Sequence, residues 1–241
     1  MPLNKTTFDF AGVPCTYYAG EAAPAALLIQ PADEHDLAVM DNEAALIADG
    51  APLSFGLAAF RVADWDKELS PWPAPPVFGD ESFGDGAAQT LATIEETLLP
   101  ALIQKLALDE KVPVILGGYS LAGLFALWSI YQTDRFAAAA AVSPSVWFPD
   151  WLAYAGARTL KADAVYLSLG GREEKTRNPV MATVGDCIRR QHTILKDQGV
   201  PTVLEWNPGN HFKDPDKRCA KGFVWCLERL EKKSRFSIKF R

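Results

Sequence analysis

Residues 112–128 read VPVILGGYSLAGLFALW, and this stretch decides the fold. A short apolar run rich in β-branched residues meets Gly117 and Gly118, and a segment of apolar helix formers begins at Leu121. The implied order is strand, tight turn and helix. Ser120 occupies the turn in a G-x-S-x-A-G pattern, with small residues on both sides. On so tight a turn a serine hydroxyl projects above the sheet, which is the geometry of a nucleophile elbow.

The motif alone does not separate catalysis from a purely structural turn. Glycine-rich turns join buried strands to buried helices in many α/β proteins, and short patterns of this kind recur by chance. Gly118 and Gly123 also have the spacing of a phosphate-binding loop. Leu124 and Phe125 follow where that loop needs lysine and serine or threonine, so the phosphate-binding alternative is excluded.

Composition narrows the classes of partner and cofactor. A net charge of −6 at pH 7 disfavours nucleic acid and anionic membranes as partners. The first residues lack the basic start and apolar run of a signal peptide, and no apolar stretch reaches membrane-spanning length, so we expect a cytoplasmic protein. The four cysteines are Cys15, Cys187, Cys219 and Cys226, and none has C-x-x-C spacing. This pattern indicates reduced, buried thiols, and we expect no metal and no cofactor.

The order of strands and helices predicts a mostly parallel central sheet with helices on both faces, in a single domain over residues 1–241. A hairpin is expected within residues 6–18. A helix capped by Asp36 or Asp41 should end near Gly50, another over 88–106 should be kinked or interrupted at Pro100, and one should end at Gly199. The final helix is expected around 219–232, followed by a solvated basic tail. The later strands are predicted at 25–29, 53–60, 112–116, 136–142, 164–169 and 202–206.

A long loop, residues 62–86, carries prolines, acidic residues and aromatic rings. Loops of this length in compact domains are usually functional, so we place it near the active site. Its rings would form apolar walls of a substrate pocket, or else fix the loop to the body. The predicted pocket residues are Trp65, Trp72 and Phe78 of this loop, Trp147 of a second aromatic loop (146–151), Tyr119 of the elbow, and His35.

A serine is inert near neutral pH unless a base removes its proton and an acid orients that base. In parallel sheets such groups gather at the carboxyl ends of strands, and Ser120, Glu173 or Glu174, and His211 each follow a predicted strand. Their order is that of nucleophile, acid and base in α/β-hydrolases. Of the other two histidines, His192 lies within a predicted helix on a solvated face, and His35 precedes the serine.

The choice of acid and of oxyanion donors rests on position. Glu173 lies three residues after Gly170 and is favoured over Glu174, although a surface carboxylate paired with Arg172 or Lys175 is the competing interpretation. The N–H of Leu121 is the first expected oxyanion donor. A second should come from the loop after Gln30, and since Pro31 has no N–H, Ala32 or Asp33 is predicted.

Residues 117–148, GGYSLAGLFALWSIYQTDRFAAAAAVSPSVWF, together with Gly209-Asn210-His211-Phe212, resemble the core of an esterase family. This family includes the siderophore esterases related to enterobactin hydrolysis, the S-formylglutathione hydrolases and the feruloyl esterases. The resemblance implies an α/β-hydrolase fold and metal-independent ester cleavage through Ser120 and His211. Two departures are Ala122, where glycine is commoner, and Gln30-Pro31-Ala32-Asp33, where relatives commonly have Asp-Gly.

The sequence thus predicts a serine esterase that cleaves a small-molecule ester through an acyl-enzyme, with a Ser120-His211-Glu173 triad. A thioesterase or amidase with the same residues is one alternative. A binding module without catalysis, on a hydrolase scaffold, is another. The physiological ester and the oligomeric state do not follow from the sequence, because a fold does not fix its substrate.

Overall fold

The computed structural model describes residues 3–10 and 12–239, which form one eight-stranded sheet in the order β1-β2-β4-β3-β5-β6-β7-β8. The first two strands are antiparallel to their neighbours, and all pairings from β4 to β8 are parallel. The strands are β1 (Asn4–Phe10), β2 (Val13–Ala19), β3 (Ala26–Ala32), β4 (Phe55–Arg61), β5 (Val114–Tyr119), β6 (Phe136–Val142), β7 (Ala164–Gly170) and β8 (Thr202–Asn207). The predicted mostly parallel sheet is confirmed.

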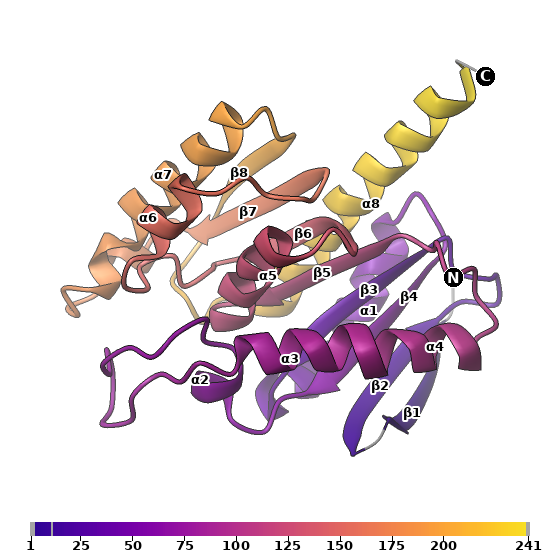
Figure 1. Cartoon of the computed structure of the whole chain (residues 1–241), viewed down its shortest axis with the longest axis horizontal. Helices are drawn as coiled ribbons and strands as arrows, with labels where there is room; N and C mark the ends of the chain where they lie inside the picture. The colour runs from indigo at the N-terminus through magenta and orange to yellow at the C-terminus, as the bar shows by residue number, and fades with distance from the viewer. Residues whose placement is uncertain (1–2, 11, 240–241) are drawn as a thin grey trace.

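Helices cover both faces of the sheet, as predicted (Figure 1). On one face α1 (Glu34–Gly50) and α8 (Pro215–Lys239) pack together over an apolar layer that includes Met40, Ile47 and Phe223. The opposite face carries a larger apolar layer beneath the remaining helices. These are α2 (Trp65–Glu68), α3 (Ala87–Thr93), the π-helical turn η1 (Ile94–Leu98), α4 (Leu99–Lys105), α5 (Leu121–Gln132), α6 (Trp151–Gly156), and α7 (Val184–Asp197) with the short 3₁₀ turns η2 (Glu173–Lys175) and η3 (Met181–Thr183).

The central strands are apolar along their whole length because they are buried on both faces. In β5, Gly117 is also needed for packing. A Cβ atom there would lie 2.5 Å from the Phe223 ring, so the missing side chain is what lets α8 approach the sheet. The predicted hairpin is confirmed as β1 and β2, although Ala11, at its expected turn, lies outside the described residues.

The start of α1 differs from the prediction. Its N-cap is Asp33, not Asp36 or Asp41, and Asp36 is the third residue of a capping box: the Asp36 N–H donates to Asp33 Oδ1 at 2.8 Å, and the Asp33 N–H donates to Asp36 Oδ2 at 3.3 Å. Strand β3 also ends later than predicted, at Ala32 and not at Ile29, so the cap of α1 follows the strand directly. Pro31 stays in the strand because β5 pairs with β3 only as far as Ile29, so no ladder bond is lost.

The α-helix over 88–106 is interrupted just before Pro100, as predicted: the π-helical turn Ile94–Leu98 separates α3 from α4, which continue as one rod (Figure 1). A wider turn of this kind accommodates a residue that cannot donate a backbone hydrogen bond. The final helix extends to Lys239 instead of ending near Lys232, so the expected solvated tail is largely helical and projects beyond the sheet.

Candidate active site

Ser120 lies between β5 and α5 with a backbone conformation that costs energy. Its φ of 57° and ψ of −117° are rare for a residue with a Cβ atom. The turn is held by the Ser120 N–H, which donates to Val142 O at 3.0 Å. Close packing requires glycine nearby, since a Cβ on Gly118 would lie 2.5 Å from the Ala122 Cβ. The predicted strand–turn–helix is therefore present, with the serine at its apex.

Three loops at the carboxyl ends of β5, β7 and β8 bring Ser120, Glu173 and His211 together. His211 Nε2 lies 3.1 Å from Ser120 Oγ, and His211 Nδ1 lies 2.7 Å from Glu173 Oε2. Both are hydrogen-bonding distances. The His211 side chain is 25% exposed, so the group remains open to solvent on one side. This geometry can move a proton from the serine hydroxyl to the imidazole while the carboxylate fixes the ring.

The two neighbouring glutamates lie in different places. Glu173 is buried beside His211, whereas Glu174 Oε2 lies 3.3 Å from Arg189 on the surface of α7. The separation arises in the 3₁₀ turn η2, which directs consecutive side chains to different sides. Of the two carboxylates proposed from the sequence, Glu173 is the one in reach of the imidazole.

Glu173 uses its two oxygens for different partners. Oε2 faces His211, while Oε1 accepts hydrogen bonds from the Gly170 N–H at 2.6 Å, Ser143 Oγ at 2.8 Å and Arg218 Nη1 at 2.9 Å. Burial by itself would raise the pKa of this carboxyl. The hydrogen bond and charge of His211, helped by Gly170 and Ser143, outweigh burial, so the pKa lies below its usual value. The carboxylate is thus anionic at neutral pH.

Arg218 was not predicted from the sequence. Its guanidinium is 2% exposed and reaches Glu173, Ser143 and Tyr119 as well as backbone carbonyls of the loop before His211. One signal could have found it. Arg218 lies in the first turn of α8, where the helix dipole disfavours a positive charge, so a compensating anion is required nearby.

Tyr119 was predicted to line the pocket, but its hydroxyl is engaged beneath the site. The O–H donates to the His211 carbonyl at 2.6 Å and accepts from Arg218 Nη1 at 2.9 Å. The ring is buried and lies 5.1 Å from the imidazole, centroid to centroid. Tyr119 therefore supports the histidine rather than forming an open pocket wall.

The candidate oxyanion donors differ in how free their N–H groups are. Leu121 is the first residue of α5, so its N–H has no partner within the helix. Ala32 O accepts from the Val62 N–H at 3.1 Å, and in an extended strand the Ala32 N–H points the same way, toward β4 and away from β5. Ala32 is therefore disfavoured. Asp33 stays the predicted second donor, with its N–H shared with Asp36.

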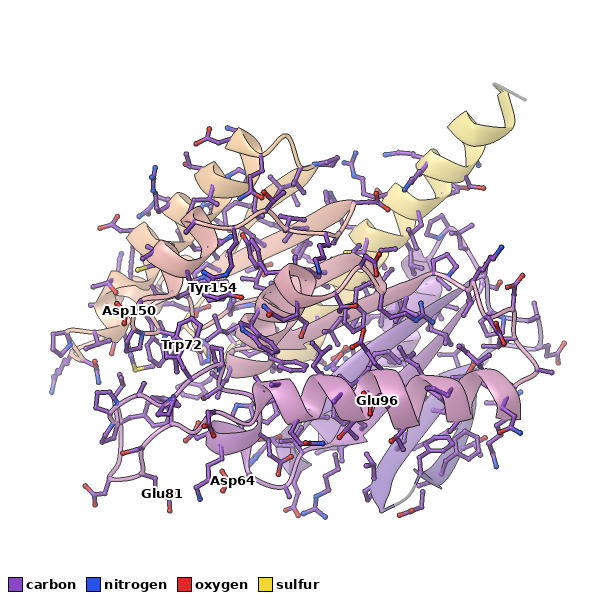
Figure 2. The ribbon with its side chains drawn as sticks, in the orientation of Figure 1. Asp64, Trp72, Glu81, Glu96, Asp150 and Tyr154 are labelled. Atoms are coloured by element: carbon purple, nitrogen blue, oxygen red, sulfur yellow. The ribbon has the colours of Figure 1, made fainter. Side chains whose placement is uncertain are left out.

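Two predicted pocket residues lie elsewhere. The His35 side chain is 97% exposed and sits 3.6 Å from Asp33, because α1 begins at Glu34 and turns this position to solvent. Trp72 packs against Phe148, Trp151 and Tyr154, and its Nε1–H donates to Pro149 O at 3.0 Å. Figure 2 shows Trp72 and Tyr154 side by side. Trp72 thus fixes loop 62–86 to the second aromatic loop and is not a free pocket wall.

The remaining predicted pocket residues lie in three different segments. Trp147 follows Ser145, whose Oγ lies 3.4 Å from Ser120 Oγ, so it belongs to the segment beside the nucleophile. Phe78 is exposed on loop 62–86, and Trp65 is half-buried against the apolar layer in α2. Two surface grooves, of about 520 Å³ between β8 and α8 and about 370 Å³ beside α1, do not include Ser120.

The described part of the chain contains neither a cluster of metal ligands nor a helix that could span a membrane. Within residues 3–10 and 12–239, no set of three or more His, Cys, Asp or Glu side chains gathers as a metal site would require. No helix in this described part of the chain combines the length and apolar character needed to cross a membrane. All four cysteines are free thiols, and Cys15, Cys219 and Cys226 are buried.

Comparisons with known proteins rest on structure alone, because no protein-family profile and no curated protein matches the sequence. An IroE-like serine hydrolase from Shewanella oneidensis superposes with a TM-score of 0.74 at 16% identity, covering 94% of this chain and 80% of that one. The siderophore hydrolase EstB from Aspergillus nidulans gives 0.72 at 16% identity, covering 95% and 96%. The enterobactin esterase FES from Shigella flexneri gives 0.67 at 14% identity, covering 95% and 60%. The chain therefore has the α/β-hydrolase fold that these esterases share.

Proposed function

We propose that this protein is a serine esterase that hydrolyses a carboxylic ester through an acyl-enzyme. The observation that carries the proposal is the pair of hydrogen-bonding contacts that joins three loops: Ser120 Oγ to His211 Nε2 at 3.1 Å, and His211 Nδ1 to Glu173 Oε2 at 2.7 Å. A nucleophile, a base and an orienting anion in this order and geometry are what acyl transfer requires.

In the first half of the reaction, Ser120 Oγ attacks the acyl carbon while His211 Nε2 takes the hydroxyl proton. The carbonyl oxygen becomes an oxyanion, and the Leu121 N–H is the donor best placed to stabilise it. Glu173 stabilises the imidazolium but does not take the proton. When the tetrahedral intermediate collapses, the ester C–O bond breaks and His211 returns the proton to the alcohol oxygen. The alcohol leaves, and the acyl group remains on Ser120.

In the second half, water replaces the alcohol. His211 removes a proton from the water as its oxygen attacks the acyl carbon, and a second oxyanion forms at the same donors. Collapse breaks the bond to Ser120 Oγ, and the proton returns to the serine. The products are a carboxylic acid and free enzyme. The EstB and FES structures are described as a siderophore hydrolase and an enterobactin esterase, so siderophore esters belong in the first substrate panel.

The test uses Ser120→Ala with Ser82→Ala as control, because Ser82 is exposed on loop 62–86. We expect Ser120→Ala to lower kcat for short p-nitrophenyl esters by about 10³-fold or more, and Ser82→Ala to leave it unchanged. A fluorophosphonate probe should add one adduct to the wild type at Ser120, located by peptide mass spectrometry. Turnover by Ser120→Ala at the wild-type rate would refute the proposal. Rates on matched ester, thioester and amide substrates assign the class of acyl compound.

A further inference from the structure

Arg218 makes five polar contacts beside the candidate site, although the proposed reaction assigns it no role. Its Nη1 lies 2.9 Å from Glu173 Oε1, 2.9 Å from the Tyr119 hydroxyl and 3.3 Å from Ser143 Oγ. Its Nη2 donates to two backbone carbonyls, those of Pro208 and Asn210, at 2.9 Å each. The five acceptors come from four segments of the chain: the end of β5, the loop after β6, the turn after β7 and the loop after β8.

The position is costly for a positive charge. The side chain is almost fully removed from water, and it lies in the first turn of α8, where the helix dipole opposes a cation. One anion, Glu173, balances the charge at 2.9 Å. A buried pair of this kind adds little to stability compared with apolar residues of the same size, so stability alone does not explain it.

The contacts divide between the acid and the base of the site. Nη1 occupies Glu173 Oε1, which leaves Oε2 as the oxygen that faces His211 Nδ1. Nη2 donates to the Asn210 carbonyl, which directly precedes His211 in its loop. The Tyr119 hydroxyl, which is bound by Arg218, donates to the His211 carbonyl itself at 2.6 Å. The guanidinium therefore ties the carboxylate and the imidazole loop to one rigid plane.

We propose that Arg218 is a positioning residue, whose guanidinium fork fixes Glu173 and the His211 loop relative to each other. The inference rests on the proposed esterase function. Arg218 does not touch the reacting atoms; it acts through Glu173, Tyr119 and the backbone at residues 208–211. Lysine cannot replace it, because an ammonium group has one nitrogen and cannot reach two sets of acceptors that the fork separates.

The test compares Arg218→Lys and Arg218→Met with Arg229→Met. Arg229 is a matched control on the same helix: it is half-buried over the Trp225 ring at 4.7 Å, and no hydrogen bond or ion pair found among the described residues joins it to the candidate site. We expect both Arg218 variants to lower kcat on p-nitrophenyl esters by about 10²-fold, the scale of a displaced catalytic group, with KM within about twofold. Arg229→Met should keep both constants.

A second measurement, by NMR, tests the position of His211 without depending on turnover. The His211 Nδ1–H proton, held by Glu173 at 2.7 Å, should give a downfield imidazole resonance in the wild type. The chain has three histidines, so single variants of His35 and His192 assign it. We expect the resonance to disappear in Arg218→Lys and Arg218→Met and to persist in Arg229→Met.

The outcomes separate the two proposals. If Arg218→Lys keeps the wild-type kcat or the downfield resonance, the positioning role is wrong, whether or not the protein is an esterase. If the wild type cleaves no ester and takes up no fluorophosphonate, the proposed function fails, while the resonance still tests the hold of Arg218 on the Glu173–His211 pair. Should Arg218→Met not fold, Arg218→Lys, which keeps the charge beside Glu173, decides by the same two readings.

Discussion

Glu173 and Glu174 are adjacent in the chain, yet one is buried against His211 and the other pairs with Arg189 at the surface. Replacement by glutamine keeps size and removes the charge, so the pair gives a controlled test of which carboxylate orients the imidazole. We expect Glu173→Gln to lower kcat by about 10³–10⁴-fold, because the amide favours the wrong tautomer of His211. Glu174→Gln should stay within about twofold. Equal losses in steady-state assays of the two variants would contradict the assignment.

Ser120 stores strain that the folded state must offset. Its φ of 57° and ψ of −117° suit glycine far better than a residue with a Cβ. Ser120→Gly and Ser120→Ala both lose the hydroxyl, but only glycine relieves the strain. The relief of strain exceeds the extra conformational entropy that glycine loses on folding. We therefore expect Ser120→Gly to be more stable than Ser120→Ala by about 1 kcal/mol. Thermal melts of the two inactive variants measure this, and a lower melting temperature for Ser120→Gly would argue against strain.

The residues of the candidate site were predictable where the signal is local. Ser120 was predicted from the small residues that flank it. Glu173 and His211 were predicted because each follows a strand in the expected order. Arg218 was missed because its contacts with Tyr119, Ser143 and Glu173 span 45 or more positions of the chain, and Ser143 was missed because its contact with Glu173 spans 30. His35 was misplaced for a different reason: α1 begins at Glu34, earlier than predicted, so this position lies on the exposed face of a helix and not in a pocket.

At the scale of elements, sequence periodicity found all eight strands but not every boundary. Strand β6 matches the prediction because Ser143-Pro144 cannot continue it, whereas β3 outruns its prediction because a proline at the end of a ladder loses no hydrogen bond. The π-helical turn before Pro100 was not predictable, since it depends on how the rod packs against the sheet. Aromatic residues of loop 62–86 were visible in the sequence, but which of them fix the loop and which stay exposed is decided by long-range packing.

The capping box of α1 makes stability depend on pH. Burial, and then the charge of Asp33, raises the pKa of Asp36 from 3.8 to about 6. Folding thus favours the neutral form of Asp36. Its contribution to the free energy of unfolding is fully present below pH 3.8 and is lost as the pH rises through about 6. Asp36→Asn keeps an acceptor for the Asp33 N–H and carries no charge. The free energy of unfolding of Asp36→Asn minus that of the wild type should increase by about 1–2 kcal/mol from pH 4 to pH 7. Denaturant melts at both pH values test this; a constant difference would contradict it.

Loop 62–86, which we predict to lie near the active site, carries a net negative charge. It carries six acidic residues and one lysine, and it is joined to the segment after Glu173 by the Asn178 side chain, which donates to Val77 O at 2.6 Å. Anionic esters should therefore be repelled, and salt should screen the repulsion. We expect kcat/KM for an anionic ester to rise severalfold from 10 mM to 300 mM salt, while a neutral ester of the same shape stays constant. The opposite trend for the anionic ester would exclude repulsion by this loop.

Across the whole molecule, packing is densest at the centre of the sheet and thinnest at its first edge. Strands β5 and β6 are buried on both faces, whereas the first four residues of β1 are exposed and, among the described strands, β1 pairs only with β2. Amide hydrogen exchange should therefore be slowest in β5 and β6, where it requires global unfolding, and faster by orders of magnitude in β1. Exchange measured peptide by peptide tests this, and uniform protection across the sheet would contradict it.

The buried arginine of α8 also has a consequence for how the protein is made. A ribosome delivers Ser120 and Glu173 long before it delivers His211 and Arg218, and strand β8 and helix α8 are the last described elements to emerge. Until then Ser120 lacks His211 and Glu173 lacks Arg218, so the site that we propose is incomplete. Under the proposed function, hydrolysis would begin only once α8 docks, and the onset of activity would report the docking of that helix.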